Sequence, residues 1–125
     1  SFIFKMNQVL MHISSLDFSF ITEESLELIL GSFARNGLKI NLMQNTAISF
    51  QVCVNEDGER LERVVEELST RFGISLEREL ELVTIRYFDQ PTIDRVTVKK
   101  EILLEQHGPT VAQMVMRDLE NRKNP

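Results

Sequence analysis

Apolar and polar positions change their spacing several times along the chain, and each spacing predicts one kind of element. Residues 8–14 are mostly apolar and end at polar residues, which predicts a buried strand. The next segment, from Thr22 to Gly37, has the three- and four-residue spacing of an amphipathic helix. Its apolar stripe consists of Leu26, Ile29, Leu30 and Phe33. Thr22 is a suitable N-cap, and Gly37 suits the left-handed conformation that ends helices.

Two strands with strict alternation follow, joined by an amide-rich corner. Apolar residues of the first strand are Leu38, Ile40 and Leu42. Those of the second strand are Ile48, Phe50, Val52 and Val54. The corner between them is formed by Gln44, Asn45 and Thr46. Such alternation is typical of strands with one buried face, so we expect helices to cover one face of an antiparallel sheet.

A second helix and a further strand complete a first unit. Asp57 is a candidate cap for a helix whose apolar face carries Leu61, Val64, Val65, Leu68 and Phe72. Gly73 is expected to end this helix as Gly37 ends the first, and 74–79 reads as a short strand. The predicted order is βαββαβ, which is the ferredoxin-like arrangement of the α+β class.

A second, incomplete unit repeats the beginning of the first. Its predicted elements are a strand over 82–88, a helix over 92–100 with Ile93, Val96 and Val98 facing inward, and strands over 102–106 and 111–116. Asp89 corresponds in position to Asp17, and Gln106 to Gln44. A last helix and strand are missing, so this unit needs a strand from residues 1–5 or from another copy of the chain. The tail, 119–125, is polar and is expected to fray.

Charge and composition exclude several classes of function. With 19 acidic and 14 basic residues the net charge is −5, and the basic residues are scattered, so binding to nucleic acid is not expected. The sequence contains no run of about 18 apolar residues, so no membrane span is predicted, and we expect a cytoplasmic protein. The single cysteine, Cys53, is interpreted as a reduced packing residue. Because the chain opens on an apolar strand without Met, we expect it to be part of a longer protein.

The sequence resembles the C-terminal regulatory region of aspartokinases, which contains tandem ACT domains. The resemblance rests on VLMHIS (9–14), FARNGLKINLMQNTAISFQVCV (33–54), LELVTIRYF (80–88), ILLEQ (102–106) and TVAQMVMRD (110–118). It implies a first ACT domain over 6–80 and a second ACT unit over 81–118, to which 1–5 are a candidate addition. In that family the first unit is inserted into the second, whose missing strand precedes it.

The same resemblance implies a function. The kinase domain of the family lies upstream and phosphorylates aspartate with MgATP, so we expect no catalytic residue, no metal and no cofactor in this chain. The expected effector is a free amino acid: lysine, threonine or methionine. A homodimer formed through the ACT units is also implied.

The expected effector site lies between the loop after the first strand and the end of the second strand. Amide groups at the start of the helix, at Ile21 and Thr22, would attract the carboxylate, and Asp17 would receive the ammonium group. The opposite wall would be formed by Asn41, Gln44, Asn45 and Thr46. A structural interpretation stays open, in which Asp17 belongs to a simple turn and the corner side chains bond their own backbone. The loop, 16–24, has no Gly or Pro, which makes close backbone approach to a ligand less easy.

Other functions are weighed against effector binding. The ACT pair could join subunits without binding a ligand, and the loop without glycine favours this assembly hypothesis. Acylphosphatase-like catalysis requires an arginine in the first loop, and 14–22 has none. Neither histidine has a Cys, Asp or Glu at metal-ligand spacing. RNA binding would require exposed aromatic and basic residues on the strands, which the pattern does not predict.

Overall fold

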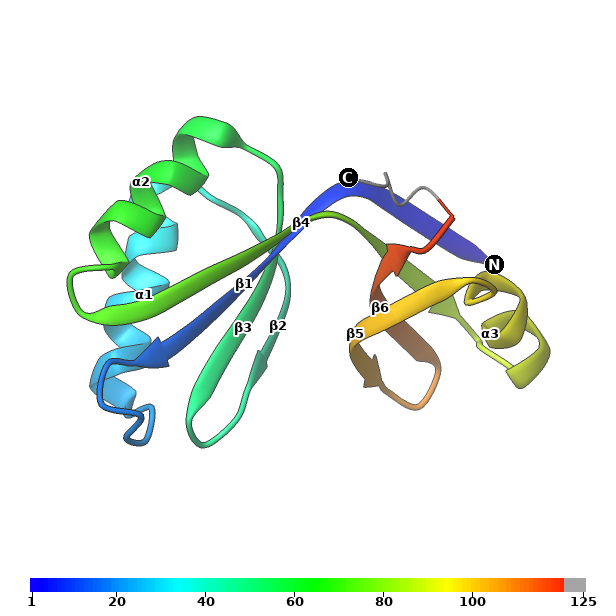
Figure 1. The fold of residues 1–125 in the computed structure, drawn as a ribbon. Coiled ribbons are helices and arrows are strands. Elements are labelled where there is room, and N and C mark those ends of the chain that lie inside the picture. Colours follow the sequence, from blue (N-terminus) through cyan, green and yellow to red (C-terminus); the bar gives the residue numbers. More distant parts are fainter. Residues whose placement is uncertain (121–125) are drawn as a thin grey trace. The chain divides into compact units, whose positions relative to one another are not determined.

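The computed structural model describes residues 1–120, which form an α+β fold of two compact units (Figure 1). The elements are β1 (Phe2–Ser15), α1 (Glu23–Asn36), β2 (Ile40–Asn45), β3 (Ser49–Asn55), α2 (Gly58–Leu68), β4 (Phe72–Arg86), α3 (Gln90–Val96), β5 (Lys100–His107) and β6 (Val111–Asp118). We call residues Val9–Arg78 the contiguous unit, and Ser1–Gln8 with the chain from Glu79 onward the split unit. The predicted tail, 119–125, lies outside the described residues beyond Glu120.

The contiguous unit has the split βαβ topology that the pattern predicts. Its strand order is β2-β3-β1-β4, so β3 separates the two strands that α1 connects. The core lies between the sheet and the helices α1 and α2, which both cover one face (Figure 1). Buried side chains of this core come from β1, α1, β3, α2 and β4, and include Val9, Met11, Ile13, Ile29, Phe33, Phe50, Val52, Val54, Leu61, Val64 and Phe72.

Both helix caps predicted at N-termini are present, but the second helix ends earlier than expected. The amide of Ser25 donates to the hydroxyl of Thr22, and the amide of Arg60 donates to the carboxylate of Asp57. Gly37 has φ 65° and ends α1 as predicted. The prediction for Gly73 is wrong, because α2 is capped at Ser69 and Gly73 lies within β4.

The burial pattern departs from the prediction at two leucines. A bulge between Ile40 and Leu42 shifts the register, so Ile40 stands opposite Val54 but Leu42 stands opposite Cys53. Leu42 therefore shares the sheet face of Cys53 instead of facing the helices as predicted. Leu30, predicted in the stripe of α1, is exposed, because the stripe is centred on Ile29 and Phe33.

The split unit contains the four strands that a complete sheet of this type requires. Its order is β1-β4-β6-β5, with the start of β1 at one edge. The amide of Arg86 donates to the carbonyl of Ser1 at 3.0 Å, which fixes the N-terminal segment beside β4. In this unit Val83, Ile85, Val96, Met114 and Met116 form the core.

Three predictions, one for β4 and two for the split unit, are wrong in detail. The strands expected over 74–79 and 82–88 are one strand, β4. The helix expected over 92–100 begins at Gln90, where Asp89 caps it, and ends at Val96, because the chain then turns into β5. Val98 is consequently exposed instead of facing inward.

A buried ion pair lies at one end of the split unit. Glu81 is 4% exposed, and the ammonium group of Lys100 lies 2.6 Å from its carboxylate and 3.6 Å from that of Asp118. Burial works to lower the pKa of Lys100, but the hydrogen bond and charge of Glu81, together with Asp118, outweigh it and raise that pKa. Lys100 is therefore charged at neutral pH and offsets the charge of Glu81 in the interior.

Candidate functional site

The loop that follows β1 forms a compact turn of its own. The backbone amide of Phe18 donates to the carbonyl of Ser15, and that of Ser19 donates to the Asp17 carboxylate at 3.1 Å. The Ser15 hydroxyl closes the loop by donating to the carbonyl of Ser19. These bonds hold Phe18 at φ 59° without a glycine. Asp17 thus takes part in a turn, as the structural interpretation expects, while its side chain stays exposed.

Of the two residues expected to attract the carboxylate, Ile21 already uses its amide and Thr22 its hydroxyl and carbonyl. Thr22 uses its hydroxyl to cap the helix, and its carbonyl accepts from Leu26. The amide of Ile21 donates to the carbonyl of Ala47 at 2.9 Å, which ties the loop to the β2–β3 turn. A ligand carboxylate would therefore have to displace a backbone bond to use Ile21.

The amide-rich corner is stabilised by local hydrogen bonds. Thr46 accepts from the amide of Ser49 at 3.1 Å and shares a 2.7 Å bond with its hydroxyl. The amide of Thr46 also donates to the carbonyl of Ser49. Asn45 is the last residue of β2, directly before this turn, and is exposed. The corner has the geometry of a self-bonded hairpin turn.

Asn41 lies apart from this corner, and Gln44 points to a different face of the sheet from the helices. Asn41 is near the other end of β2, where its amide donates to Asn55 at 2.8 Å. Four residues of strand separate it from Asn45, roughly 13 Å at the usual rise. Gln44 stands opposite Gln51, on the face away from α1 and α2. There Gln51 contacts His12, which in turn bonds Glu77 at 2.7 Å. Ligand binding at these residues stays a prediction, and the fold does not bring all seven together.

A hollow of about 350 Å³ opens on the other side of the β1–α1 loop, towards β4. Its lining consists of Ser15, Leu16, Asp17, Ser25, Leu28, Arg71 and Phe72. Asp17 is the residue that the sequence already indicated, and Arg71 is new. Arg71 belongs to the turn between α2 and β4, where its amide donates to the carbonyl of Leu68.

The hollow carries one charge of each sign. Hydrogen bonds from Ser19, through its side chain and its backbone, hold the pKa of Asp17 below its usual value, so this carboxylate is ionised at neutral pH. Within residues 1–120, no carboxylate forms an ion pair with the guanidinium of Arg71. The arrangement offers an acceptor for a cation and a donor for an anion on the walls of one depression.

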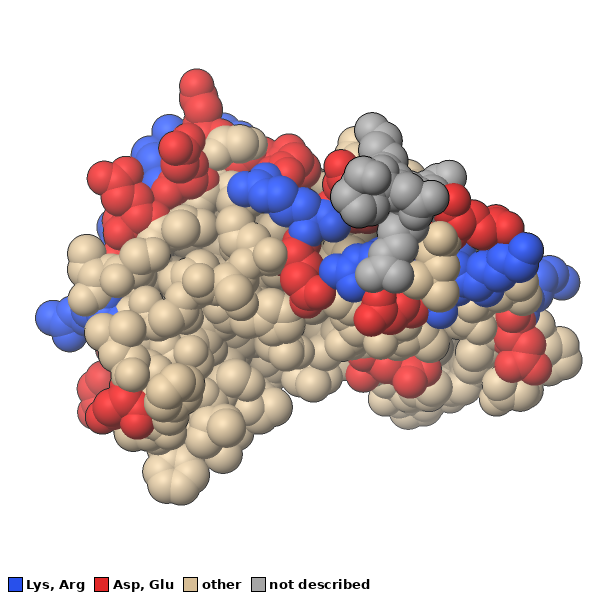
Figure 2. Space-filling model, viewed as in Figure 1, with Lys and Arg blue, Asp and Glu red and all other residues tan. Residues whose placement is uncertain are grey.

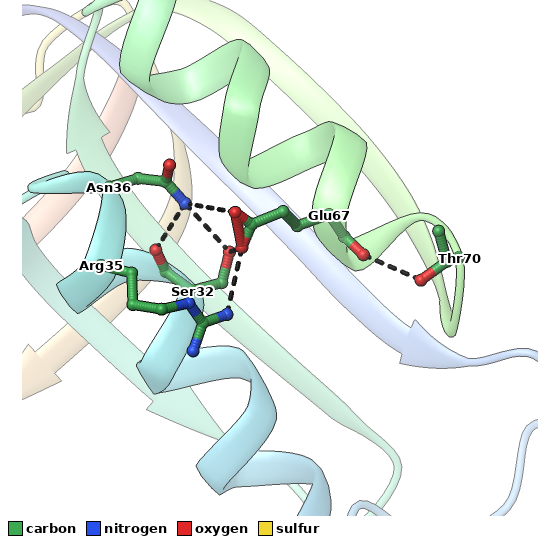
Figure 3. A network of polar contacts seen from close by, with 5 residues as sticks. All are labelled: Ser32, Arg35, Asn36, Glu67 and Thr70. Carbon is green, nitrogen blue, oxygen red and sulfur yellow. Dashed lines mark hydrogen bonds and ion pairs between the residues drawn. The ribbon is translucent and has the colours of Figure 1, made fainter.

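A polar network joins α1, which contributes to the lining of this hollow, to α2, which ends shortly before Arg71 (Figure 3). The Glu67 carboxylate of α2 accepts from the Ser32 hydroxyl at 2.9 Å, from Arg35 at 3.1 Å and from Asn36 at 3.0 Å, all on α1. Thr70 caps the end of α2 by donating to the carbonyl of Glu67 at 2.9 Å. The network therefore holds the α2–β4 turn, and with it the backbone of Arg71, against α1.

Sequence reasoning missed Arg71 for an identifiable reason. The pattern extends α2 to Phe72, which would make Arg71 one more solvated residue of a charged helix. The structure ends α2 at Leu68 and places Phe72 in β4, buried. Arg71 then stands at a turn beside a buried aromatic ring. A stronger signal was available in Ser69 and Thr70, which favour turns over helix interiors.

Residues 1–120 contain no group of three or more His, Cys, Asp or Glu that could hold a metal ion. No helix in this part of the chain is long and apolar enough to span a membrane. On the face shown in Figure 2, acidic and basic side chains are intermixed over α2, without a continuous basic surface.

The topology of both units is that of ACT-like domains, and solved structures share it over almost the whole chain. No protein-family model matches the sequence, and a search of the curated proteins finds no match. Aspartokinase III from E. coli, in complex with lysine and aspartate, superposes with a TM-score of 0.74 at 17% identity, over 97% of this chain and 30% of that one.

Separate regulatory domains and subunits match over most of their own length. A proposed C-terminal regulatory domain of aspartate kinase from Porphyromonas gingivalis has a TM-score of 0.77 at 9% identity, covering 97% of this chain and 87% of that one. The ligand-free regulatory subunit of aspartate kinase from Thermus thermophilus has a TM-score of 0.66 at 11% identity, covering 95% of this chain and 87% of that one. The chain therefore has the fold of aspartokinase regulatory domains and spans 30% of the E. coli enzyme.

Proposed function

We propose that this chain is the regulatory region of an aspartate kinase and that it senses a free amino acid. The observation that carries the proposal is the order of the two units along the chain. The contiguous unit is inserted into the sequence of the split unit, whose sheet is completed by Ser1–Gln8. The likeness to separate regulatory domains extends over nearly the full length of both chains, which supports this function more than a single ACT-like unit would.

Regulation would work through differential affinity. An effector that binds one arrangement of the parent enzyme more tightly than another shifts the population towards it, by no more than the difference in binding free energy. Lysine, threonine and methionine are the candidate effectors. The phosphorylation of aspartate with MgATP would take place in a kinase domain outside this chain. Cys53, the single cysteine, is buried and reduced, which suits the cytoplasm where such an enzyme would work.

Effector titration tests the proposal. We expect at least one of the three amino acids to raise the melting temperature of the chain and to inhibit the parent kinase, because a ligand that binds only the folded state stabilises it. Differential scanning fluorimetry and the rate of ADP release measure the two effects. Absence of both responses to all three amino acids contradicts the sensing function.

A second candidate function, subunit assembly without a ligand, is favoured by the exposed start of β1. Phe2, Ile3, Phe4 and Met6 are all more than a third exposed on an edge strand of the split unit. Long apolar edge strands readily pair with another chain. The partner we propose is a second copy, paired antiparallel about Phe4. Ile3 would then face Lys5 of the other copy, and like charges would not be directly opposed.

A further inference from the structure

We infer that the hollow beside Asp17 and Arg71 binds a free α-amino acid whose side chain is apolar. This inference rests on the proposed function and deepens it by naming the site and the class of effector. It also places the effector on the β4 side of the β1–α1 loop, because none of the corner residues Gln44, Asn45 and Thr46 lines the hollow.

The charges of the hollow match the common part of every amino acid. An α-amino acid carries one ammonium and one carboxylate group, and the lining offers one carboxylate, Asp17, and one guanidinium, Arg71. Ser19 uses the Oδ1 atom of Asp17 as an acceptor, and an ionised carboxylate has further acceptor positions for an ammonium group. Arg71 can hold a ligand carboxylate with two parallel hydrogen bonds.

The rest of the lining favours an apolar side chain on the ligand. Leu16, Leu28 and Phe72 supply an apolar wall, and Leu16 and Leu28 are 63% and 42% exposed. A ligand side chain that covers these two leucines removes apolar surface from water. A third charge, such as the second ammonium group of lysine, would lack a partner in the lining and would lose hydration without compensation.

The hydroxyl groups of the lining are already engaged. The Ser15 hydroxyl donates to the carbonyl of Ser19, and the Ser25 hydroxyl bonds that of Thr22 at 3.1 Å. A hydroxyl on the ligand would therefore compete with existing bonds. Methionine fits this wall better than threonine or lysine. At about 350 Å³ the hollow is at the small end of the range for small-molecule sites, roughly 300–1,000 Å³, as suits a single amino acid.

Isothermal titration of the full chain with methionine, threonine and lysine tests the inference. We expect methionine to bind most tightly. The Arg71→Gln and Asp17→Asn variants should each weaken methionine binding about ten-fold, because each loses one charge-assisted contact. Arg63→Gln, on the exposed side of α2, is the matched control and should bind as the parent does.

Two methionine derivatives separate a direct contact from a structural effect. Methionine amide lacks the carboxylate, and N-acetylmethionine lacks the ammonium group. The preference for methionine over its amide should disappear in Arg71→Gln, while the preference over N-acetylmethionine should disappear in Asp17→Asn. A variant that is merely less well folded would keep both preferences.

The outcomes distinguish the two proposals. If an amino acid binds but both variants bind it unchanged, the hollow is not the site, although sensing stands. Loss of binding in Asn45→Ala with no loss in Arg71→Gln would place the effector at the corner instead. If lysine binds most tightly of the three amino acids, the inference that the ligand has an apolar side chain is wrong. If no amino acid binds the chain or inhibits the parent kinase, the sensing function itself falls.

Discussion

Gly37 is the residue whose identity the backbone constrains most directly. Its φ of 65° lies in the left-handed region, where a side chain is strained. A Cβ atom there would meet the Arg60 side chain at 3.5 Å, an ordinary contact. The cost of a substitution therefore comes from the backbone and not from crowding.

We expect Gly37→Ala to lower the free energy of unfolding by about 1 kcal/mol, because alanine does not adopt this conformation without strain. Gly58→Ala is the matched control. Gly58 has open space around its Cβ position and no left-handed φ, so its substitution should be close to neutral. Urea unfolding followed by circular dichroism measures both. Equal stability of the two variants would contradict this account.

At the same scale, part of the candidate site could be predicted from the sequence. Asp17 could be selected because an acidic residue in a loop before a helix is a simple local pattern. Arg71 could not, since its role depends on where α2 ends and on β4 returning beside α1. Local patterns identify charged loop residues, but they do not predict which ones line the same hollow.

Among the elements, α1 and α2 are joined by the carboxylate of Glu67. Hydrogen bonds from Asn36, Ser32 and Arg35 hold the pKa of Glu67 below its usual value of 4.5. A carboxyl group with a lowered pKa in the folded state adds stability above its unfolded pKa. That contribution is lost as the pH falls through the folded-state pKa.

Glu67→Gln should therefore be less stable than the parent at neutral pH, and the difference should shrink below pH 4.5. Glu66→Gln, a neighbour on the same helix outside this network, serves as the control and should change little. Thermal unfolding across this pH range measures the difference. If the destabilisation does not vary with pH, the contribution of Glu67 comes from the packing of its side chain and not from its charge.

Element types were predictable where periodicity was strong, and their ends were not. The stripe through Ile29 and Phe33 and the caps at Thr22 and Asp57 define helices without help from the fold. The pattern predicts two strands in place of β4 because the middle of β4, near Glu79, is polar. In the structure Glu79 has φ 59° within the continuous strand. Pairing with neighbouring strands carries β4 through this residue, and no local pattern contains that information.

At the scale of the whole molecule, the exposed start of β1 leads to a prediction about assembly. If two copies pair about Phe4, Ile3→Lys places the introduced lysine opposite Lys5 of the partner, and the like charges oppose pairing. We expect the parent chain to dimerise and this variant to be monomeric in analytical ultracentrifugation. Ile48→Lys, at an exposed apolar residue of the contiguous unit, should still dimerise. A monomeric parent chain, or a dimeric Ile3→Lys variant, would exclude this interface.

The two long strands also determine the order in which the chain can fold during synthesis. All residues of the contiguous unit are available once Arg78 has been made, but the split unit must wait for β6. Residues Ser1–Gln8 are made before the whole contiguous unit, yet they are among the last of this region to find their partners. At typical translation rates the apolar segment Phe2–Met6 stays unpaired for roughly 5–20 s. During that interval it is a target for chaperones, and Lys5 supplies its one charge against aggregation.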